Sequence, residues 1–335
     1  MSKKTRLLTL LALLLTAATG AWAQRLYLEV NGTAATLKYS ANEADYSGKP
    51  SFTGTTWQNA SGFKAYVTTI TVDASCENFA GDKLQGLFTA CSVLTSVTGL
   101  GTINTTNVTT MQQMFNNCSK LETVDLSGFN TANVTTMQQM FYGCSALETV
   151  DLSGFNTANV TDMKNMFQGC TGLKSVNFSG LNTSGVTTMT YMFQGCTGLQ
   201  TLDLSDLNTS SVTDMRNMFH NCTGLQTLDI SSFNTENVTK MGSMFHSCSQ
   251  LTAIFVGAGW IVASSANSMF TDCTNLPNWD GTSNGTKAYY GGDGKGYLTY
   301  KVAAPASTYT VTLKEGTEDA TSWTIAPAEA TTTIC

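Results

Sequence analysis

Charge is scarce in this chain, and positive charge is scarcer than negative. Only 12% of the residues are charged, with 17 Lys and Arg against 23 Asp and Glu. Because nucleic acids are bound by clustered Lys and Arg, we expect no nucleic-acid partner. Ser, Thr, Asn and Gln supply most of the polarity, which favours binding through hydrogen bonds over electrostatic steering.

The usual signatures of metal sites and catalysis are also missing. No CxxC or CxxH spacing occurs, and the sequence has only two histidines, so we expect no metal and no cofactor. The repeated Asp, Ser and Thr lack a paired His, and no phosphate-binding glycine loop is present. We therefore expect no enzyme.

Long apolar runs are limited to the N-terminus. A basic stretch at residues 2–6 precedes an apolar run over 7–18 and the triplet Ala21-Trp22-Ala23. This pattern predicts a signal peptide at 1–23, cleaved after Ala23, and a secreted or cell-surface protein. The apolar run is too short for a membrane span, and no later run is long enough for the mature chain to have one. Cleavage would change the formal net charge from −6 to −9, since Lys3, Lys4 and Arg6 are lost.

A repeat of 26 residues dominates the rest of the sequence. Its cells follow the pattern NTxxVTxMxxMFxxCxxLxxΦDΦSxΦ, where Φ is apolar, and weaker copies surround Cys91 and Cys273, so residues 84–276 contain about eight cells. Such cells bury their apolar side only by stacking on one another in register. The six regular cysteines are 26 residues apart: Cys118, Cys144, Cys170, Cys196, Cys222 and Cys248.

Each cell predicts two elements. The apolar spacing from Val134 to Cys144 is typical of a two-turn helix, with Thr135 as N-cap, Gln138 closing a capping box and a left-handed residue before the cysteine. Val150 and Leu152 then alternate with polar residues, as in a strand with one buried face. The predicted fold class is an α/β solenoid with a parallel β-sheet spine, short helices and β-containing caps.

The motifs Leu-x-x-Val-x-Leu, Met-Phe-x-x-Cys-x-x-Leu and Asn-Thr-x-x-Val-Thr resemble those of the BspA-like leucine-rich-repeat surface proteins of host-associated bacteria. The resemblance spans roughly Leu84 to Leu276. It implies a right-handed coil and a role in adhesion to host matrix proteins, to epithelia or to other bacteria. It carries no binding residues over to this chain.

The flanks are expected to cap the stack. Residues 24–83 form a β-rich N-terminal cap that opens with a type I′ hairpin at Asn31-Gly32. Residues 277–301 form a C-terminal cap, in which packing in the core is the favoured role of the aromatic side chains Trp279, Tyr289, Tyr290 and Tyr297. Residues 302–335 are interpreted as a linker and the start of a truncated β domain.

Several repeated polar slots are expected to be structural. The repeat cysteines are predicted to be a buried, reduced ladder, because parallel side chains one cell apart do not favour disulfide geometry. His220 and His246 should be neighbours with solvated side chains, in the slot of Gln168 and Gln194. The repeated Asn-Thr slot beginning at Asn130 is explained by side-chain hydrogen bonds to the loop backbone.

The exposed strand face is the candidate ligand-binding site. Its hydroxyls and acids would engage a host extracellular-matrix or epithelial protein, a glycan or another bacterial cell. The alternative for the face is a solvated sheet surface, and the alternative for the protein is a structural spacer or variable coat element without a dedicated ligand. The predicted site residues are Thr123, Asp125, Ser127, Thr149, Asp151, Ser153, Asn177, Thr201, Asp203, Ser205, Thr227, Asp229 and Ser231.

Overall fold

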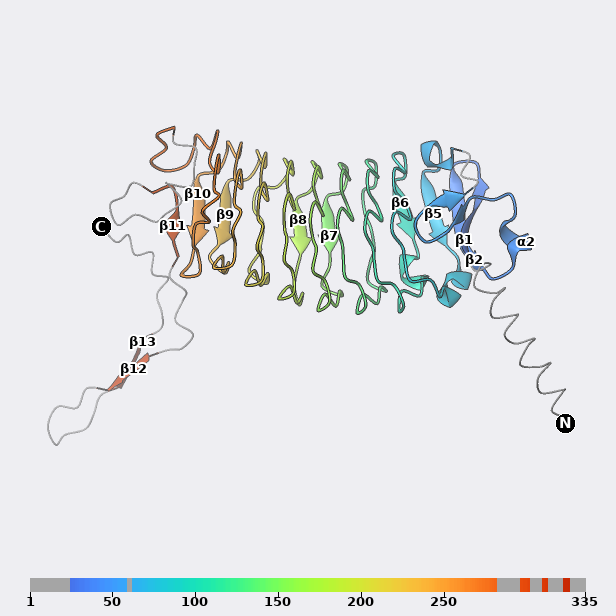
Figure 1. Ribbon diagram of the computed structural model, residues 1–335, viewed down its shortest axis with the longest axis horizontal. Helices are drawn as coiled ribbons and strands as arrows, with labels where there is room; N and C mark the ends of the chain where they lie inside the picture. Colours follow the sequence, from blue (N-terminus) through green and yellow to red (C-terminus); the bar gives the residue numbers. More distant parts are fainter. Residues whose placement is uncertain (1–24, 59–61, 282–295, 302–308, 313–321, 326–335) are drawn as a thin grey trace.

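The computed structural model describes residues 25–58, 62–281, 296–301, 309–312 and 322–325, so the predicted signal peptide lies outside it. Figure 1 shows a long row of stacked coils, with β1, β2 and α2 at one end and β10 and β11 at the other. Within the described ranges, no helix has the length and apolar character that a membrane crossing requires. The strands are β1 (Arg25–Asn31), β2 (Ala34–Ser40), β3 (Ser51–Phe52), β4 (Trp57–Gln58), β5 (Thr69–Val72), β6 (Ser96–Thr98), β7 (Thr149–Asp151), β8 (Ser175–Asn177), β9 (Thr227–Ile230), β10 (Ala253–Val256), β11 (Thr299–Tyr300), β12 (Tyr309–Thr312) and β13 (Ser322–Ile325); the helices are α2 (Glu43–Tyr46) and three 3-10 turns, η1 (Phe63–Ala65), η2 (Ala74–Asn78) and η3 (Leu100–Thr102).

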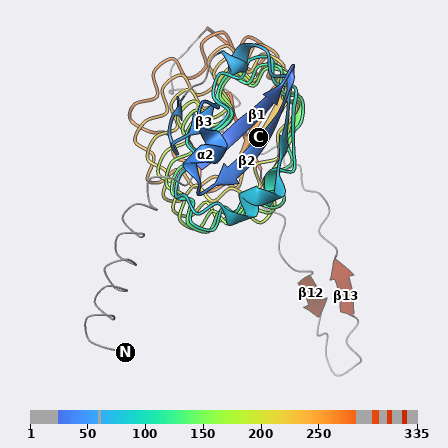
Figure 2. The ribbon, with the colours of Figure 1, turned by 90° about the vertical axis from the view of Figure 1, so that its right-hand side faces the viewer.

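The N-terminal cap is a six-stranded sheet of order β4-β3-β1-β2-β5-β6. Strands β1 and β2 form the predicted hairpin, but Asn31 pairs with Ala34, so its loop is Gly32-Thr33. Gly32 has a φ of 61° and Thr33 is not left-handed, which is the pattern of a type II′ turn and not of the type I′ turn expected at Asn31-Gly32. Strand β5 pairs in parallel with β6, with Thr69 opposite Ser96, so the sheet of the cap runs directly into the coils (Figure 1). Figure 2 looks along the stack from the cap, with β1 and β2 in front of the coils.

Parallel pairing joins the coils along two lines. Strands β7 and β8 pair with Val150 opposite Val176, and β10 pairs with both β9 and β11. The spine is interrupted, because β7–β8 and β9–β11 belong to separate sheets. Elsewhere in each coil, single parallel bridges link Lys83, Thr110, Thr136, Asp162, Thr188, Asp214, Lys240 and Ser265 in that order. The result is a sheet-rich, solenoid-like stack.

One apolar core runs through the stack. In the regular cells, every Met, Phe and Cys of the MxxMFxxC motif is completely buried, as Met137, Phe141 and Cys144 show at 0% exposure. The phenylalanines stack ring on ring with centroid separations of 5.3 to 5.9 Å. This confirms that successive cells share a single interior. The stacked rings belong to Phe88, Phe115, Phe141, Phe167, Phe193, Phe219, Phe245 and Phe270.

The two-turn helix predicted in each cell is wrong. The segment from Met137 to Cys144 consists of turns, in which Met140 N–H donates to Met137 O at 3.2 Å and Cys144 N–H to Phe141 O at 3.1 Å. Gln139, in the middle of the segment, is left-handed at a φ of 56°. The left-handed residue predicted before each cysteine is confirmed, with φ of 69° at Gly143.

Hydrogen bonds to the next coil explain why turns replace the helix. The N–H groups of Met137, Gln139, Phe141 and Gly143 donate to carbonyls of the following coil, for example Phe141 N–H to Met166 O at 2.9 Å. An α-helix would use such donors within itself. Thr135 is likewise no N-cap, because its hydroxyl donates to Thr109 O of the preceding coil at 3.2 Å.

At the C-terminal end, aromatic side chains close the core. Tyr297 is buried and lies edge-on to Phe270 and beside the partly buried Trp279, so their predicted packing role is confirmed. Tyr289 and Tyr290 lie outside the described residues. Within residues 302–335, interpreted as a linker and the start of a β domain, β12 pairs antiparallel with β13.

Candidate ligand-binding surface

One line of side chains on the strand face, here termed the Asp/Asn column, has a structural role that the sequence did not indicate. It consists of Asp125, Asp151, Asn177, Asp203 and Asp229. In each cell its side-chain oxygen accepts the backbone N–H of the serine two residues on, as in Ser153 N–H to Asp151 Oδ1 at 2.9 Å. Asn177 makes the same bond with Ser179 at 3.1 Å and also donates to Asp151 Oδ1 at 3.0 Å. The column therefore makes an Asx turn at the same place in each of these five cells, although only β7, β8 and β9 form strands there.

These bonds also determine the charge of the column. Donation from the serine backbone N–H holds the pKa of Asp125, Asp151 and Asp203 below the usual 3.8. For Asp229, partial burial raises the pKa, but hydrogen bonds from Lys301 and Ser231 outweigh it and the pKa is lowered. The acids are thus ionised at neutral pH, in spite of their stacking.

The structure brings part of the predicted site together around one hollow. Thr201, Asp203, Ser205, Thr227, Asp229 and Ser231, with Leu202, Ser232 and Lys301, line a cavity of about 410 Å³. Lys301 Nζ lies 2.6 Å from Asp229 Oδ2. Sequence reasoning missed Lys301, because only the parallel pairing of β11 with β10 places it beside this face.

The remaining predicted site residues line neither this hollow nor a second one on another part of the coils. They are Thr123, Asp125, Ser127, Thr149, Asp151, Ser153 and Asn177, and all have exposed side chains. The strand face is therefore a long polar strip with one concave region towards its C-terminal end.

The Asn-Thr slot is confirmed as structural. Asn130 Oδ1 accepts Ala132 N–H at 3.1 Å, as predicted. The following threonine does more than expected: buried Thr183 donates its hydroxyl to Asn208 O at 2.9 Å and accepts Asn208 N–H at 2.8 Å. The hydroxyls of Thr105, Thr131 and Thr209 make the same two-way link to the next coil.

The cysteine ladder is buried and reduced, as predicted. All nine described cysteines are free, and the thiol of Cys170 donates to Phe141 O of the preceding coil at 3.0 Å. Burial raises the pKa of Cys170 and Cys222 to about 12. Cys76, whose state the sequence left open, is free and buried, while Cys335 lies outside the described residues.

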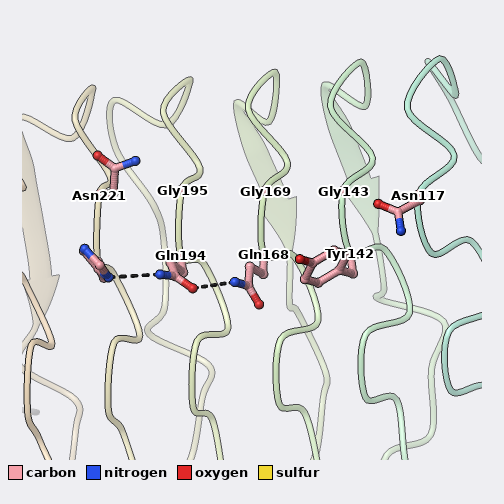
Figure 3. A pocket seen from close by; sticks show the side chains of 9 residues that line it. Asn117, Tyr142, Gly143, Gln168, Gly169, Gln194, Gly195 and Asn221 are labelled. Carbon is pink, nitrogen blue, oxygen red and sulfur yellow. Dashed lines mark hydrogen bonds between the residues drawn. The ribbon is translucent and has the colours of Figure 1, made fainter. Parts of the chain in front are cut away.

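A second hollow lies on another part of the coils. One line of side chains, here termed the Gln–His row, consists of Tyr142, Gln168, Gln194, His220 and His246. Its first four members, with Asn117, Gly143, Gly169, Gly195 and Asn221, line a cavity of about 420 Å³ (Figure 3). The predicted neighbours His220 and His246 do stack, with ring centroids 4.6 Å apart. They are half-buried, which corrects their expected solvation.

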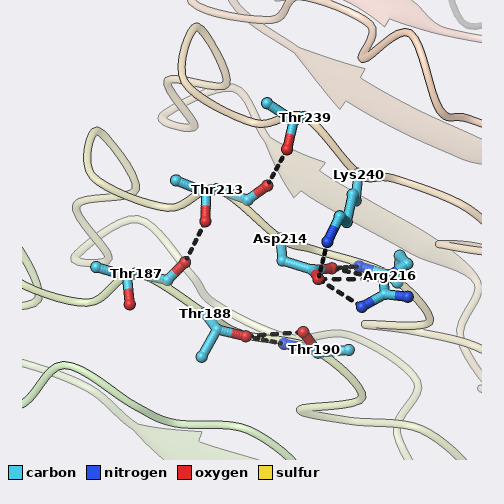
Figure 4. Close-up of polar contacts among 8 residues, drawn as sticks. All are labelled: Thr187, Thr188, Thr190, Thr213, Asp214, Arg216, Thr239 and Lys240. Atoms are coloured by element: carbon cyan, nitrogen blue, oxygen red, sulfur yellow. Dashed lines mark hydrogen bonds and ion pairs between the residues drawn. The ribbon is translucent and has the colours of Figure 1, made fainter.

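A third polar region surrounds Asp214 (Figure 4). Its carboxylate accepts from Arg216 Nη2 at 2.7 Å and lies 3.9 Å from Lys240 Nζ. Partial burial raises the pKa of Asp214, but its bonds to Arg216 outweigh this and the pKa is lowered. The neighbouring Thr213 hydroxyl donates to Thr187 O of the preceding coil at 3.2 Å. These contacts stabilise the stack, and no group of three or more metal-ligating side chains occurs among the described residues.

A family model described as a Mycoplasma protein of unknown function, DUF285, matches residues 82–179 and 173–282, which together are more than half of the chain. This chain belongs to the DUF285 family. The matched residues are those of the coils described above, so the DUF285 segment is the stack itself.

Other comparisons add little to the DUF285 assignment. No curated protein matches this DUF285 member. Among solved structures, a chain in a crystal structure of a TLR13–ssRNA13 complex is similar over 63% of this chain, with 12% identity and a TM-score of 0.27. The match covers 42% of that chain, so this protein spans less than half of its length, and so slight a likeness carries no argument.

Proposed function

We propose that this DUF285 protein is a secreted or surface-displayed binding protein that adheres to a protein or glycan ligand through its strand face. In this proposal the stack is a right-handed leucine-rich-repeat coil of the BspA-like type. The ligand belongs to the host extracellular matrix, to an epithelial surface or to another bacterial cell. No catalysis is involved.

The observation that carries the proposal is the hollow bounded by Asp203, Asp229 and Lys301. Concave sites with a few convergent polar groups are where ligands bind best. Here two ionised acids, one lysine and several hydroxyls converge on about 410 Å³. Ligands that carry hydroxyls, amides or a cationic group would find partners there.

A second candidate is a spacer with no dedicated ligand. The Asx turns favour it, because they give the acids a reason to be present that needs no partner. The two functions differ in whether Asp203 and Asp229 bind a ligand or only form the turns.

Binding assays with paired Asp-to-Asn variants separate the two functions. The purified chain is tested on surfaces coated with matrix proteins, glycans or bacterial cells. Asn177 shows that asparagine makes the same turn, so Asp203→Asn with Asp229→Asn removes charge while keeping the fold. Since a hydrogen bond to a charged group contributes about 1.5–3 kcal/mol, this double variant should weaken adhesion about tenfold or more.

Asp125→Asn is the matched control, because it makes the same change outside the hollow. It should adhere like the unaltered chain. Absence of adhesion to every surface, or equal loss in both variants, would favour the spacer.

A further inference from the structure

The Gln–His row is a hydrogen-bonded line with a defined direction (Figure 3). Gln168 Nε2 donates to Gln194 Oε1, and Gln194 Nε2 lies 2.9 Å from His220 Nδ1. Since an amide nitrogen only donates, Nδ1 accepts and the imidazole proton is on Nε2. Each amide uses one of its two N–H groups in the row, which leaves the second for a ligand.

Three glycines, which have no side chains, form the floor of this hollow. Gly143, Gly169 and Gly195 follow the row residues in successive coils, all left-handed with φ between 69° and 76°. Their N–H groups already donate to the next coil, as in Gly169 N–H to Gln194 O at 2.7 Å. An extended peptide would find no backbone edge to pair with here.

The lining offers no formal charge to a ligand. Its side chains are amides, a phenol and the imidazole of His220. Burial, followed by the charge of His246, lowers the pKa of His220 from 6.5, so the ring is neutral at physiological pH. Anionic and cationic ligands therefore gain no ion pair from this hollow.

We propose that this hollow binds a neutral oligosaccharide laid along the coils. Sugar hydroxyls both donate and accept. The amides of Gln168 and Gln194 each keep an N–H donor and an oxygen lone pair, and the His220 imidazole keeps its Nε2–H donor. The glycines leave room for a sugar ring, and the half-buried Tyr142 adds an aromatic side chain to the lining. This site is separate from the strand face and does not depend on the function proposed for it.

Two variants change the hollow without disturbing the coil. Asparagine occupies the glycine slot at Asn117 and Asn221, both left-handed, so Gly169→Asn is compatible with the backbone while filling the floor. A Cβ at Gly169 would lie 3.6 Å from Gly143 Cα, an ordinary contact. Gln194→Leu keeps the side-chain size and removes the donor and acceptor.

The test is binding of the purified chain to named polysaccharides. Starch, xylan, galactomannan and mixed-linkage glucan serve as neutral probes, with heparin, hyaluronan and polygalacturonate as acidic ones. We expect binding to at least one neutral polymer. Titration with its oligosaccharide should give a Kd that rises about tenfold or more in Gly169→Asn and in Gln194→Leu. Asp125→Asn, which lies outside both hollows, should leave the Kd within about twofold.

Three outcomes would overturn the proposal: no neutral polymer bound, binding to acidic polymers alone, or wild-type affinity in both hollow variants. Sugar binding lost in Asp203→Asn but kept in Gly169→Asn would assign the sugar to the strand face and also overturn it. Adhesion to proteins through the strand face could fail while this site holds, so the two proposals are distinguishable.

Discussion

At the scale of single residues, buried polar groups keep the coils in register. The hydroxyl of Thr183 joins the N–H and C=O of Asn208, and the thiol of Cys170 bonds a phenylalanine carbonyl one coil back. Leaving one such buried group without a partner costs about 1–3 kcal/mol. Register is therefore specified by hydrogen bonds as well as by apolar packing.

His220 makes stability depend on pH. Burial and the charge of His246 hold its pKa below the ordinary 6.5, so the unfolded chain binds the proton more tightly. Stability is therefore full above pH 6.5 and falls as the pH drops through and below it. His220→Gln, which copies Gln168 and Gln194, should lose less stability between about pH 7 and pH 5. Urea unfolding at several pH values measures this.

His246→Gln is the companion variant, because it removes the neighbouring ring while leaving His220 bonded to Gln194. The pH dependence assigned to His220 should persist there in weaker form. An unchanged pH profile in His220→Gln would contradict the assignment.

At the scale of elements, the sequence predicted which residues are inside but not how the backbone turns. The spacing of Met137, Met140, Phe141 and Cys144 fits a helical face, and all four are buried. The same spacing also fits successive turns whose corners point inward. Only the neighbouring coil decides between them, because its carbonyls accept the N–H groups that a helix would use. Such partners lie 25 residues away, beyond any local pattern.

Ser243 distinguishes a turn from a helix by mutation. It is left-handed, with a φ of 56°, in the middle of the segment predicted to be helical. In a helix, glycine there would be about 1 kcal/mol less stable than alanine. In the observed turn, alanine bears the left-handed strain, so Ser243→Gly should be more stable than Ser243→Ala by about 0.5–1 kcal/mol. Denaturant unfolding of the pair gives the sign, and a more stable alanine variant would argue against the turn.

The candidate site was likewise predicted only in part. The exposure of Thr201, Asp203 and Thr227 followed from strand alternation, and the structure bears it out. The hollow did not follow, since it needs Lys301, which directly follows β11 and lies 72 residues after Asp229 in the sequence. The Gln–His hollow was missed because its floor is glycine backbone, which carries no chemical signal in a sequence.

At the scale of the whole molecule, two contacts recur from coil to coil although the sheet spine is interrupted. The bridges from Lys83 to Ser265 and the stacked phenylalanines both advance one coil at a time. The 26-residue period was enough to predict this stacking, because identical cells can share a core only in register.

Deletion of one complete coil should therefore be tolerated. Removing residues 157–182 joins Asn156 to Thr183 and recreates the Asn-Thr junction of the other cells. The shortened chain should fold and unfold cooperatively, with modestly lower stability. Removing residues 170–182 alone should prevent folding, because the half coil that remains interrupts both the line of parallel bridges and the stack of phenylalanines. Circular dichroism and denaturant titration compare the two, and similar behaviour of both deletions would contradict the shared register.

The free thiols have a consequence for how such a chain is made. No described coil is cross-linked, and each forms its bonds with the coils directly before and after it. A nascent chain can thus add finished turns in the order in which they are synthesised, with no oxidant or isomerase and no wait for distant residues.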